Sequence, residues 1–230
     1  MKKLIILISF MLFSFQTFAN DIYITQSGNN LDLDILQDGQ NNVAGTSGTA
    51  IQLTGNSMTF NIDQVGNSNV VSTVINGNSY SGNIDLTGNS NTVALTCDSG
   101  GSNCETVQMS IDATSSGANI TVNIGTSADS QEFVGTLDLT STNTDTIVLT
   151  VNAAKSDMDI DITNNALGSS AGVTGNFTQT GDGDISGHSM KHGHTGEGAT
   201  IDILQSGIYD NKLDMTTNGT GADIDIIQRD

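Results

Sequence analysis

Three histidines lie close together near the C-terminal end of the chain, at His188, His192 and His194. Imidazoles at such close spacing could bind a transition metal, with nearby carboxylates as additional ligands. Lys191 interrupts the group, however, and the spacing matches no established zinc pattern. Asp182-Gly183-Asp184 resembles part of a calcium loop but lacks the remaining ligand positions of an EF-hand. The segment 181–198 is therefore predicted to be a polar, glycine-rich insertion without a metal, and metal binding by the histidines is left as the alternative.

Cys97 and Cys104 are the two cysteines of the chain, and they bracket a short segment of Asp, Ser, Gly and Asn. The spacing differs from the Cys-x-x-Cys pattern of redox sites, and residues 1–19 resemble a secretory signal, so the two cysteines are expected to meet an oxidising compartment, in which cysteines usually pair. The sequence therefore predicts a disulfide that closes a turn.

The remaining residues give little support for catalysis. The histidines all fall in one segment, and no nucleophile is framed by a base. Arg229 is the only arginine, so few basic side chains are available to bind a sugar or a phosphate. The chain is predicted not to be an enzyme and to have no cofactor.

Residues 1–19 have the composition of a secretory signal. Lys2 and Lys3 precede an apolar run, and Thr17-Phe18-Ala19 supplies small residues for cleavage before Asn20. Loss of this segment removes two lysines and takes the formal charge from −19 to −21. So acidic a chain is a poor ligand for nucleic acid or for an anionic membrane surface. The sequence predicts a secreted, cell-surface protein that has no membrane span after removal of the signal.

Glycine recurs at intervals of eleven residues in the N-terminal half of the chain, and this spacing predicts the fold that holds the histidines and cysteines. Gly28 and Gly39 are eleven apart, and so are successive members of the series Gly55, Gly66, Gly77 and Gly88. Each lies in a polar turn, and apolar residues alternate between the turns, as in the segment 31–35. A strand and a turn repeated at constant spacing predict an all-β parallel β-solenoid, with about 11 residues per half-coil and two half-coils per coil. The segment 45–48 is predicted to be an enlarged turn.

The alternation also assigns the two faces of each strand. In Leu31-Asp32-Leu33-Asp34-Ile35 and Met158-Asp159-Ile160-Asp161-Ile162 the aliphatic residues point inward and the aspartates outward. The aspartates are predicted to form a solvated face, with a cation-binding ladder of carboxylates as the alternative. Stacked carboxylates repel one another. If copies of the chain stack on one another, their association is therefore expected to accelerate as the pH falls toward the pI of about 4.1.

Several repeats resemble those of the curlin family, the subunits of bacterial curli fibres. The family pattern is Gln, any residue, Gly, two residues, Asn, any residue, Ala, with a further Gln eleven residues after the first. The segment 37–44 matches this pattern in full, and the segment 64–71 matches it with Val for Ala. Gln26 precedes Gln37 by eleven, and Gln205-Ser206-Gly207 and Gln228 match in part. Leucines stand at two positions, 53 and 86, where the pattern expects glutamine.

The resemblance implies a secreted subunit that stacks as a parallel β-solenoid and polymerises end to end into amyloid-like fibres for adhesion and biofilm matrix. It also implies that inward Gln and Asn form hydrogen-bonded ladders and that Gly permits the tight bends. The residues to which it assigns these roles are Gln26, Gly28, Gln37, Gly39, Asn42, Gln64, Gly66, Asn69, Gly77, Gly88, Asn91, Gln205 and Gly207.

The predicted organisation has four parts: a signal peptide over 1–19, a β-solenoid over 20–180, the Gly/His-rich insertion over 181–198 and a C-terminal curlin-like repeat over 199–230. The predicted partners are other copies of the chain, with other curli-like subunits or a nucleator as further candidates. The alternative is a monomeric surface solenoid that binds a receptor, glycan or cations through one face. An ice-binding face would need a regular array of threonines, and the threonines are scattered along the sequence. Neither end segment, 22–24 or 228–230, provides a helix to cover a terminal coil.

Overall fold

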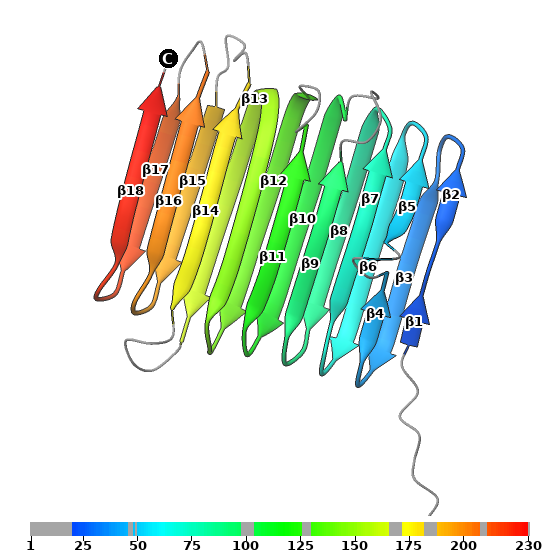
Figure 1. Ribbon diagram of the computed structural model, residues 1–230, viewed down its shortest axis with the longest axis horizontal. Helices are drawn as coiled ribbons and strands as arrows, with labels where there is room; N and C mark the ends of the chain where they lie inside the picture. Colours follow the sequence, from blue (N-terminus) through cyan, green and yellow to red (C-terminus); the bar gives the residue numbers. More distant parts are fainter. Residues whose placement is uncertain are drawn as a thin grey trace, which may run out of the picture.

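The computed structural model describes residues 20–45, 48, 50–97, 104–125, 130–165, 172–181, 188–207 and 211–229. The predicted signal segment and the Asp182–Asp184 run lie outside these residues. The described chain is all-β and forms a parallel β-solenoid of stacked coils, which confirms the predicted fold class (Figure 1).

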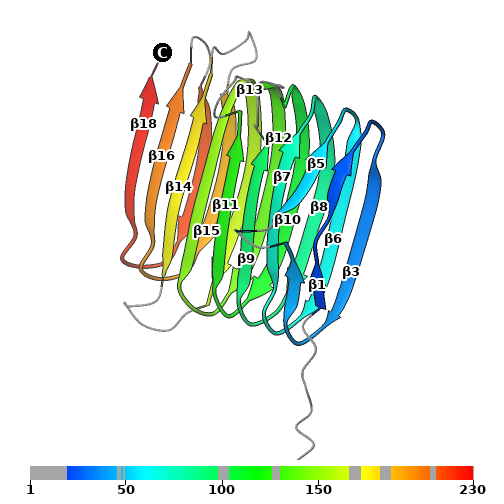
Figure 2. The ribbon, with the colours of Figure 1, turned by 45° about the vertical axis from the view of Figure 1, so that its right-hand side comes forward.

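Two parallel sheets face each other across a narrow core (Figure 2). Sheet A contains β1 (Asn20–Ile22), β2 (Thr25–Ser27), β4 (Asn42–Ala44), β5 (Ile51–Thr54), β7 (Val70–Asn76), β9 (Asn91–Cys97), β11 (Ala118–Ile124), the first part of β13 (Asp145–Asn164), β14 (Val173–Thr180), β16 (Thr200–Ser206) and β18 (Asp223–Arg229). Sheet B contains β3 (Asp32–Gly39), β6 (Met58–Gly66), β8 (Ser79–Thr87), β10 (Thr106–Ser115), β12 (Ser130–Ser141), the second part of β13, β15 (His188–Thr195) and β17 (Lys212–Asn218). The chain alternates between the sheets, so each strand pairs with strands one coil away.

The register shows how the repeat drifts without losing its phase. Thr59 lies opposite Ser81, which is the 22-residue coil that the glycine spacing predicts. Between β8 and β10, Ser79 lies opposite Thr106, so that coil holds five more residues. The extra residues fall between the end of β9 and the start of β10, and both strands remain in register with the preceding coil. Insertions that leave the strands in phase preserve the inward and outward assignment of every residue.

The enlarged turn predicted over 45–48 lies in part outside the described residues. The strands on either side of it, β4 and β5, both pair with the continuous β7, so together they form one row of sheet A. Strand β13 runs through Asp145–Asn164 and passes from sheet A into sheet B. It includes the segment 158–162, whose alternation predicts a strand.

The core consists of the inward residues of both sheets, mainly Ile, Leu and Val. Three large aromatic side chains are fully buried, at Phe60, Phe133 and Phe177. Glycine makes room for two of them, because a Cβ on Gly135 would lie 2.4 Å from the Phe133 ring and one on Gly175 would lie 2.5 Å from the Phe177 ring. In a core one side chain deep, a large ring needs a small neighbour on the same face of the strand.

The predicted insertion over 181–198 requires the largest correction. His188–Thr195 forms the regular strand β15, which pairs with β13 on one side and with β17 on the other. Its inward positions are His188, Met190, His192 and His194, all buried. The solenoid therefore continues through His188–Thr195 into the C-terminal repeat.

Candidate functional site

The apolar residues that remain accessible lie almost entirely at the two ends of the solenoid. Among the described residues, the partly buried hydrophobics packed on the core are Ile22, Ile24, Leu31, Leu33, Leu213, Met215 and Ile224. All of them lie in the terminal coils. The exposed large hydrophobics are Tyr23, Leu36, Val65, Ile226 and Ile227, and only Val65 lies away from the ends. Within the described residues, the core is therefore closed along its length and open at both ends.

The strand edges at these ends also have no partner strand within the described chain. At one end β18 pairs with β16 and β17 pairs with β15, and at the other β1, β2 and β3 pair only with β4, β5 and β6. Figure 1 shows β18 and β17 at the left and β1, β2 and β3 at the right. Such edges are templates for a further strand.

The predicted glutamines form two short ladders. In sheet B, Gln64 donates from Nε2 to Oε1 of Gln37, and both side chains are buried. This ladder stops at the next coil, where Leu86 lies opposite Gln64 and Oε1 of Gln64 is buried without a partner. Gln26 begins the first coil opposite Leu53, so it joins no ladder inside the described chain.

The second ladder lies in sheet A at the C-terminal end. Gln205 donates to Oε1 of Gln179 at 2.7 Å, and Gln228 donates to Oε1 of Gln205 at 2.7 Å. Gln179 is not among the predicted ladder residues, although Gln179-Thr180-Gly181 has the same Gln-x-Gly order as the other repeats. In both ladders the donor belongs to the later coil, so the side-chain amides all point in one direction along the axis.

The predicted asparagines bind the backbone rather than one another. Asn42 donates to the carbonyl of Gln37 at 2.9 Å and to that of Val65, one coil further, at 3.0 Å. Asn69 and Asn91 repeat this arrangement at the next two coils. Each asparagine therefore closes a corner of its own coil and ties it to the next one. This geometry matters because a buried carbonyl without a donor costs about 1–3 kcal/mol.

Further along the chain, Asp145 lies at the corner position that these asparagines occupy in earlier coils. Its buried carboxylate accepts hydrogen bonds from the backbone N–H of Ala118 at 2.9 Å, from Asn164 Nδ2 at 2.6 Å and from the Ser141 hydroxyl. Burial raises the pKa of Asp145, and these three donors offset part of that shift. Asp145 therefore has a structural position, in which it accepts hydrogen bonds from three donors of the fold.

The predicted turn glycines permit close stacking of one coil on the next. A Cβ on Gly66 would lie 1.5 Å from the carbonyl oxygen of Gly39, and one on Gly77 would lie 1.6 Å from that of Gly55. Gly28 and Gly66 have φ values of +147° and +155°. A Cβ on Gly88 would clash with the side chain of Asn69, and one on Gly207 would clash with the side chain of His188.

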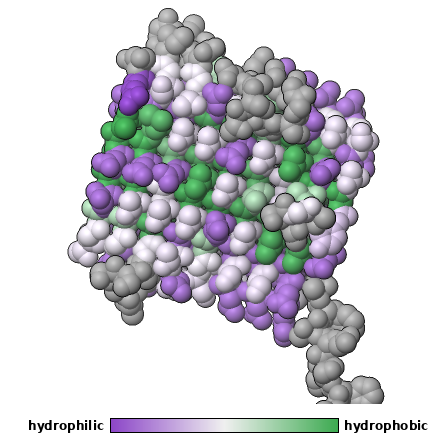
Figure 3. Space-filling view, viewed as in Figure 1, coloured by the Kyte–Doolittle hydropathy of each residue, from purple (hydrophilic) through white to green (hydrophobic). Residues whose placement is uncertain are grey.

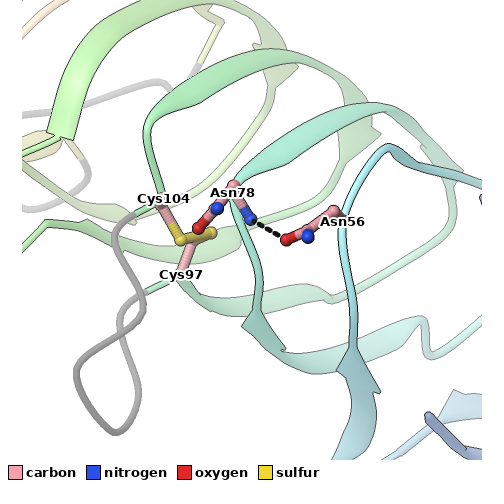
Figure 4. The surroundings of a disulfide bond; sticks show 4 residues. All are labelled: Asn56, Asn78, Cys97 and Cys104. Carbon is pink, nitrogen blue, oxygen red and sulfur yellow. Dashed lines mark hydrogen bonds between the residues drawn. A yellow bond between two sulfur atoms is a disulfide. The ribbon is translucent and has the colours of Figure 1, made fainter. Parts of the chain in front are cut away.

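Cys97 and Cys104 form the predicted disulfide (Figure 4). Their Cα atoms are 5.9 Å apart, and both side chains are buried. The bond closes the base of the five-residue insertion between β9 and β10. Asn78 lies beside it, and the backbone N–H of Asn78 donates to Oδ1 of Asn56 in the preceding coil at 3.2 Å. A loop of this length contributes about 2.5 kcal/mol on the chain-entropy estimate.

The three histidines lie inside the core, where they cannot act as a surface metal site. His188 Nδ1 lies 2.8 Å from the Ser156 hydroxyl, and the rings of His192 and Phe177 are 4.9 Å apart. Both ring nitrogens of His192 and of His194 are buried without a hydrogen-bond partner. Burial lowers the pKa of His192 to about 4, and it lowers the pKa of His188 and His194 as well. Within the described chain no three His, Cys, Asp or Glu residues converge to hold a metal.

The outward aspartates of sheet B form a continuous ladder. The register stacks Asp63, Asp85, Asp112, Asp138 and Asp161 on five consecutive strands. Partial desolvation, and then the charges of the neighbouring aspartates, raise the pKa of Asp85 and of Asp138. The carboxylates therefore repel one another, as the sequence predicts, and they lie on the outer face of the fold.

The outer face of sheet A differs, because threonine and asparagine gather there in columns. One column contains Thr92, Asn119, Thr146, Thr174 and Thr200, and a second contains Thr96, Asn123, Thr150 and Thr178. Figure 3 shows this face, on which pale residues lie among purple and green ones. The threonines are thus not scattered in space. Their sequence separations of 26 to 28 residues differ from the basic repeat, so the array becomes apparent only from the register.

These features define a parallel β-solenoid whose first and last described coils are uncovered within the described residues, and its family is not shown. Comparison with known protein families, curated proteins and solved structures finds no match. Among the described residues, no helix has the length and apolar character needed to span a membrane.

Proposed function

We propose that the protein is a secreted structural subunit that polymerises end to end into extracellular, curli-like amyloid fibres for cell adhesion and biofilm matrix. The observation that carries the proposal is the concentration of exposed apolar side chains and unpaired strand edges in the two terminal coils. A solenoid that works as a monomer protects these surfaces with polar caps. Here each end offers both backbone groups for pairing and apolar residues for burial.

The glutamine ladders support the same proposal. Ladders of stacked amides along a fibre axis are typical of cross-β assemblies. The C-terminal ladder ends at Gln228, which is exposed on the last described strand, and Gln37 begins the ladder at the other end. Stacking of subunits would extend both ladders.

Electron microscopy and fibre diffraction of purified protein at neutral pH test this function. We expect unbranched fibres with a meridional reflection near 4.8 Å, since the strands lie perpendicular to the stacking axis. A protein that remains monomeric in analytical ultracentrifugation at high concentration would contradict the proposal.

Replacement of Ile226 by lysine is expected to slow fibre elongation about tenfold or more. Ile226 faces the open end of the core and is 46% exposed, so the charge is tolerated in the monomer but becomes buried on stacking. Val65 is a matched control, because it is 43% exposed but lies on the side of the solenoid. Thioflavin kinetics should show slow elongation for Ile226→Lys and near-normal elongation for Val65→Lys. Equal effects of the two substitutions would argue against end stacking.

The threonine columns favour one second candidate, a face that binds an ordered surface such as ice or an insoluble glycan. Hydroxyls along a column repeat at about 4.8 Å, the spacing of neighbouring strands. If this face binds, Thr146→Lys with Thr174→Lys should abolish cosedimentation with an insoluble polysaccharide and partition into growing ice. Thr140→Lys, at an exposed threonine of sheet B, should leave both unchanged. Wild-type protein that binds neither surface would exclude this candidate.

A further inference from the structure

The two ends of the solenoid match each other in a particular register. We infer that successive subunits, stacked end to end as in the proposed function on which this inference rests, are related by a half-turn about the fibre axis. In that arrangement β3 of one copy pairs with β18 of the preceding copy, and β1 and β2 pair with β17. The occupant of each end is thus a second copy of this chain.

The reason for the half-turn is topological. The first and the last described strands, β1 and β18, both belong to sheet A. A copy added by translation alone would place β1 and β2 against β18 and would leave a vacant row in sheet B between β17 and β3. A half-turn exchanges the positions of the two sheets and reverses the strand direction of each, so every strand remains parallel to its neighbours. Sheet B then continues through β1 and β2, and sheet A continues through β3, with no vacant row.

The sequences of the paired strands agree position by position. With Gln228 opposite Gln37, the inward residues Ile226 and Ile224 lie opposite Ile35 and Leu33. The exposed Ile227 lies opposite the exposed Leu36, which are 45% and 72% accessible in the isolated chain. The side-chain amide polarity also continues, because Gln37 would donate to Gln228 in the same direction as Gln228 donates to Gln205.

The same offset aligns the second pair of strands. Leu213 and Met215 of β17 lie opposite Ile22 and Ile24, and Thr217 lies opposite Gln26. The spacing agrees because Thr217 precedes Gln228 by eleven residues, as Gln26 precedes Gln37. Two independent strand pairings therefore require one and the same placement of the second copy.

Charge complementarity favours this placement. Within the described chain the basic side chains are Lys155, Lys191, Lys212 and Arg229, and the first two form ion pairs with Glu132 at 2.8 Å and Asp159 at 3.2 Å. The other two lie on the terminal strands β17 and β18. In the half-turn register Arg229 lies opposite Asp38 and Lys212 opposite Asp21. Translation alone would instead place Arg229 opposite Ser27.

The junction also stacks like charges, with Asp223 opposite Asp32 and Asp225 opposite Asp34. The solenoid already tolerates such pairs, because Asp202 lies opposite Asp225 within the chain. The two ion pairs at the margins of the strands offset this repulsion and select the register.

Cysteine cross-linking tests the half-turn directly. Ile227→Cys and Leu36→Cys in one chain place thiols at opposite ends of the solenoid, so they can pair only between copies. In the half-turn register the two Cα atoms lie on adjacent strands, within the range that a disulfide spans. Oxidised fibres should give a ladder of covalent multimers in denaturing gels without reductant. The control chain carries Ile227→Cys and Thr25→Cys, whose thiols meet only under translation, and should give no ladder. A ladder from the control, or from neither chain when both form fibres, would overturn the half-turn while leaving the proposed function intact.

Charge reversal at the ion pair provides a second test, and it leaves the core residues unchanged. Arg229→Asp alone and Asp38→Arg alone should each raise the critical concentration for fibre growth about fivefold, the effect of one surface ion pair. An equimolar mixture of the two variants should recover the wild-type value, because every junction between unlike copies is complementary. No effect of Asp38→Arg, or no recovery in the mixture, contradicts the register. Absence of wild-type fibres would instead contradict both the register and the proposed function.

Discussion

Replacement of Gly66 by alanine is expected to lower the free energy of unfolding by about 4 kcal/mol. The added Cβ would lie 1.5 Å from the carbonyl oxygen of Gly39 and 2.4 Å from Oδ1 of Asn42. The first contact is with the backbone of the adjacent coil, and the second is with a buried corner asparagine. Moving either neighbour would therefore cost free energy of folding. The φ of +155° adds backbone strain for any residue with a side chain.

Urea unfolding followed by circular dichroism measures this loss, and hydrogen exchange locates it. Because each coil contacts only its neighbours, faster exchange should be concentrated in β3 and β6. Gly48→Ala is the matched control, since a Cβ at Gly48 has no atom within 4 Å, and it should change stability by less than about 0.5 kcal/mol. Equal stability of the two variants would show that the coils do not stack at the turn glycines.

Acidification from pH 7 to pH 4 is expected to cost the C-terminal coils about 3 kcal/mol through His192 alone. The folded pKa of about 4 lies below the usual value of 6.5, because burial disfavours the charged ring. Between pH 4 and pH 6.5, His192 is therefore mostly protonated in the unfolded chain and mostly neutral in the folded chain. Stability is fully present above pH 6.5 and decreases as the pH falls through this range. His188 and His194 are shifted in the same direction and add to the loss.

The variant His192→Phe tests this assignment, because a phenyl ring keeps the contact with Phe177 but does not titrate. Its unfolding free energy should depend on pH less steeply than that of the wild type, by about 1.4 kcal/mol per pH unit between pH 6.5 and 4. A variant that retains the wild-type slope would show that other groups dominate. The raised pKa of Asp145 acts in the opposite direction, since protonation of that carboxyl favours the folded state.

Acid has opposite effects on the fold and on the proposed assembly. Protonation of the aspartate ladder, beginning with groups of raised pKa such as Asp85 and Asp138, removes repulsion along sheet B. The expectation that association accelerates toward pH 4.1 therefore remains a prediction. The buried histidines limit it, because the C-terminal coil must remain folded to present β17 and β18.

The sequence by itself determined the fold class and the orientation of most strands. Strict alternation, as in the segment 31–35, places aliphatic residues inside and aspartates outside whatever the partner strand is. The glycine spacing predicts the coil, because a tight bend between stacked coils leaves no room for a Cβ. The disulfide was also predictable, since its two cysteines are close in sequence and flank a short insertion.

Only the tertiary structure decided what depends on register between coils. The segment 181–198 has the glycine and histidine content of a loop, yet β15 is held in the solenoid because strands on both sides pair with it. The threonine columns are likewise invisible in the sequence. Each joins residues separated by insertions of variable length, and local propensity carries no information about which coil a residue will face.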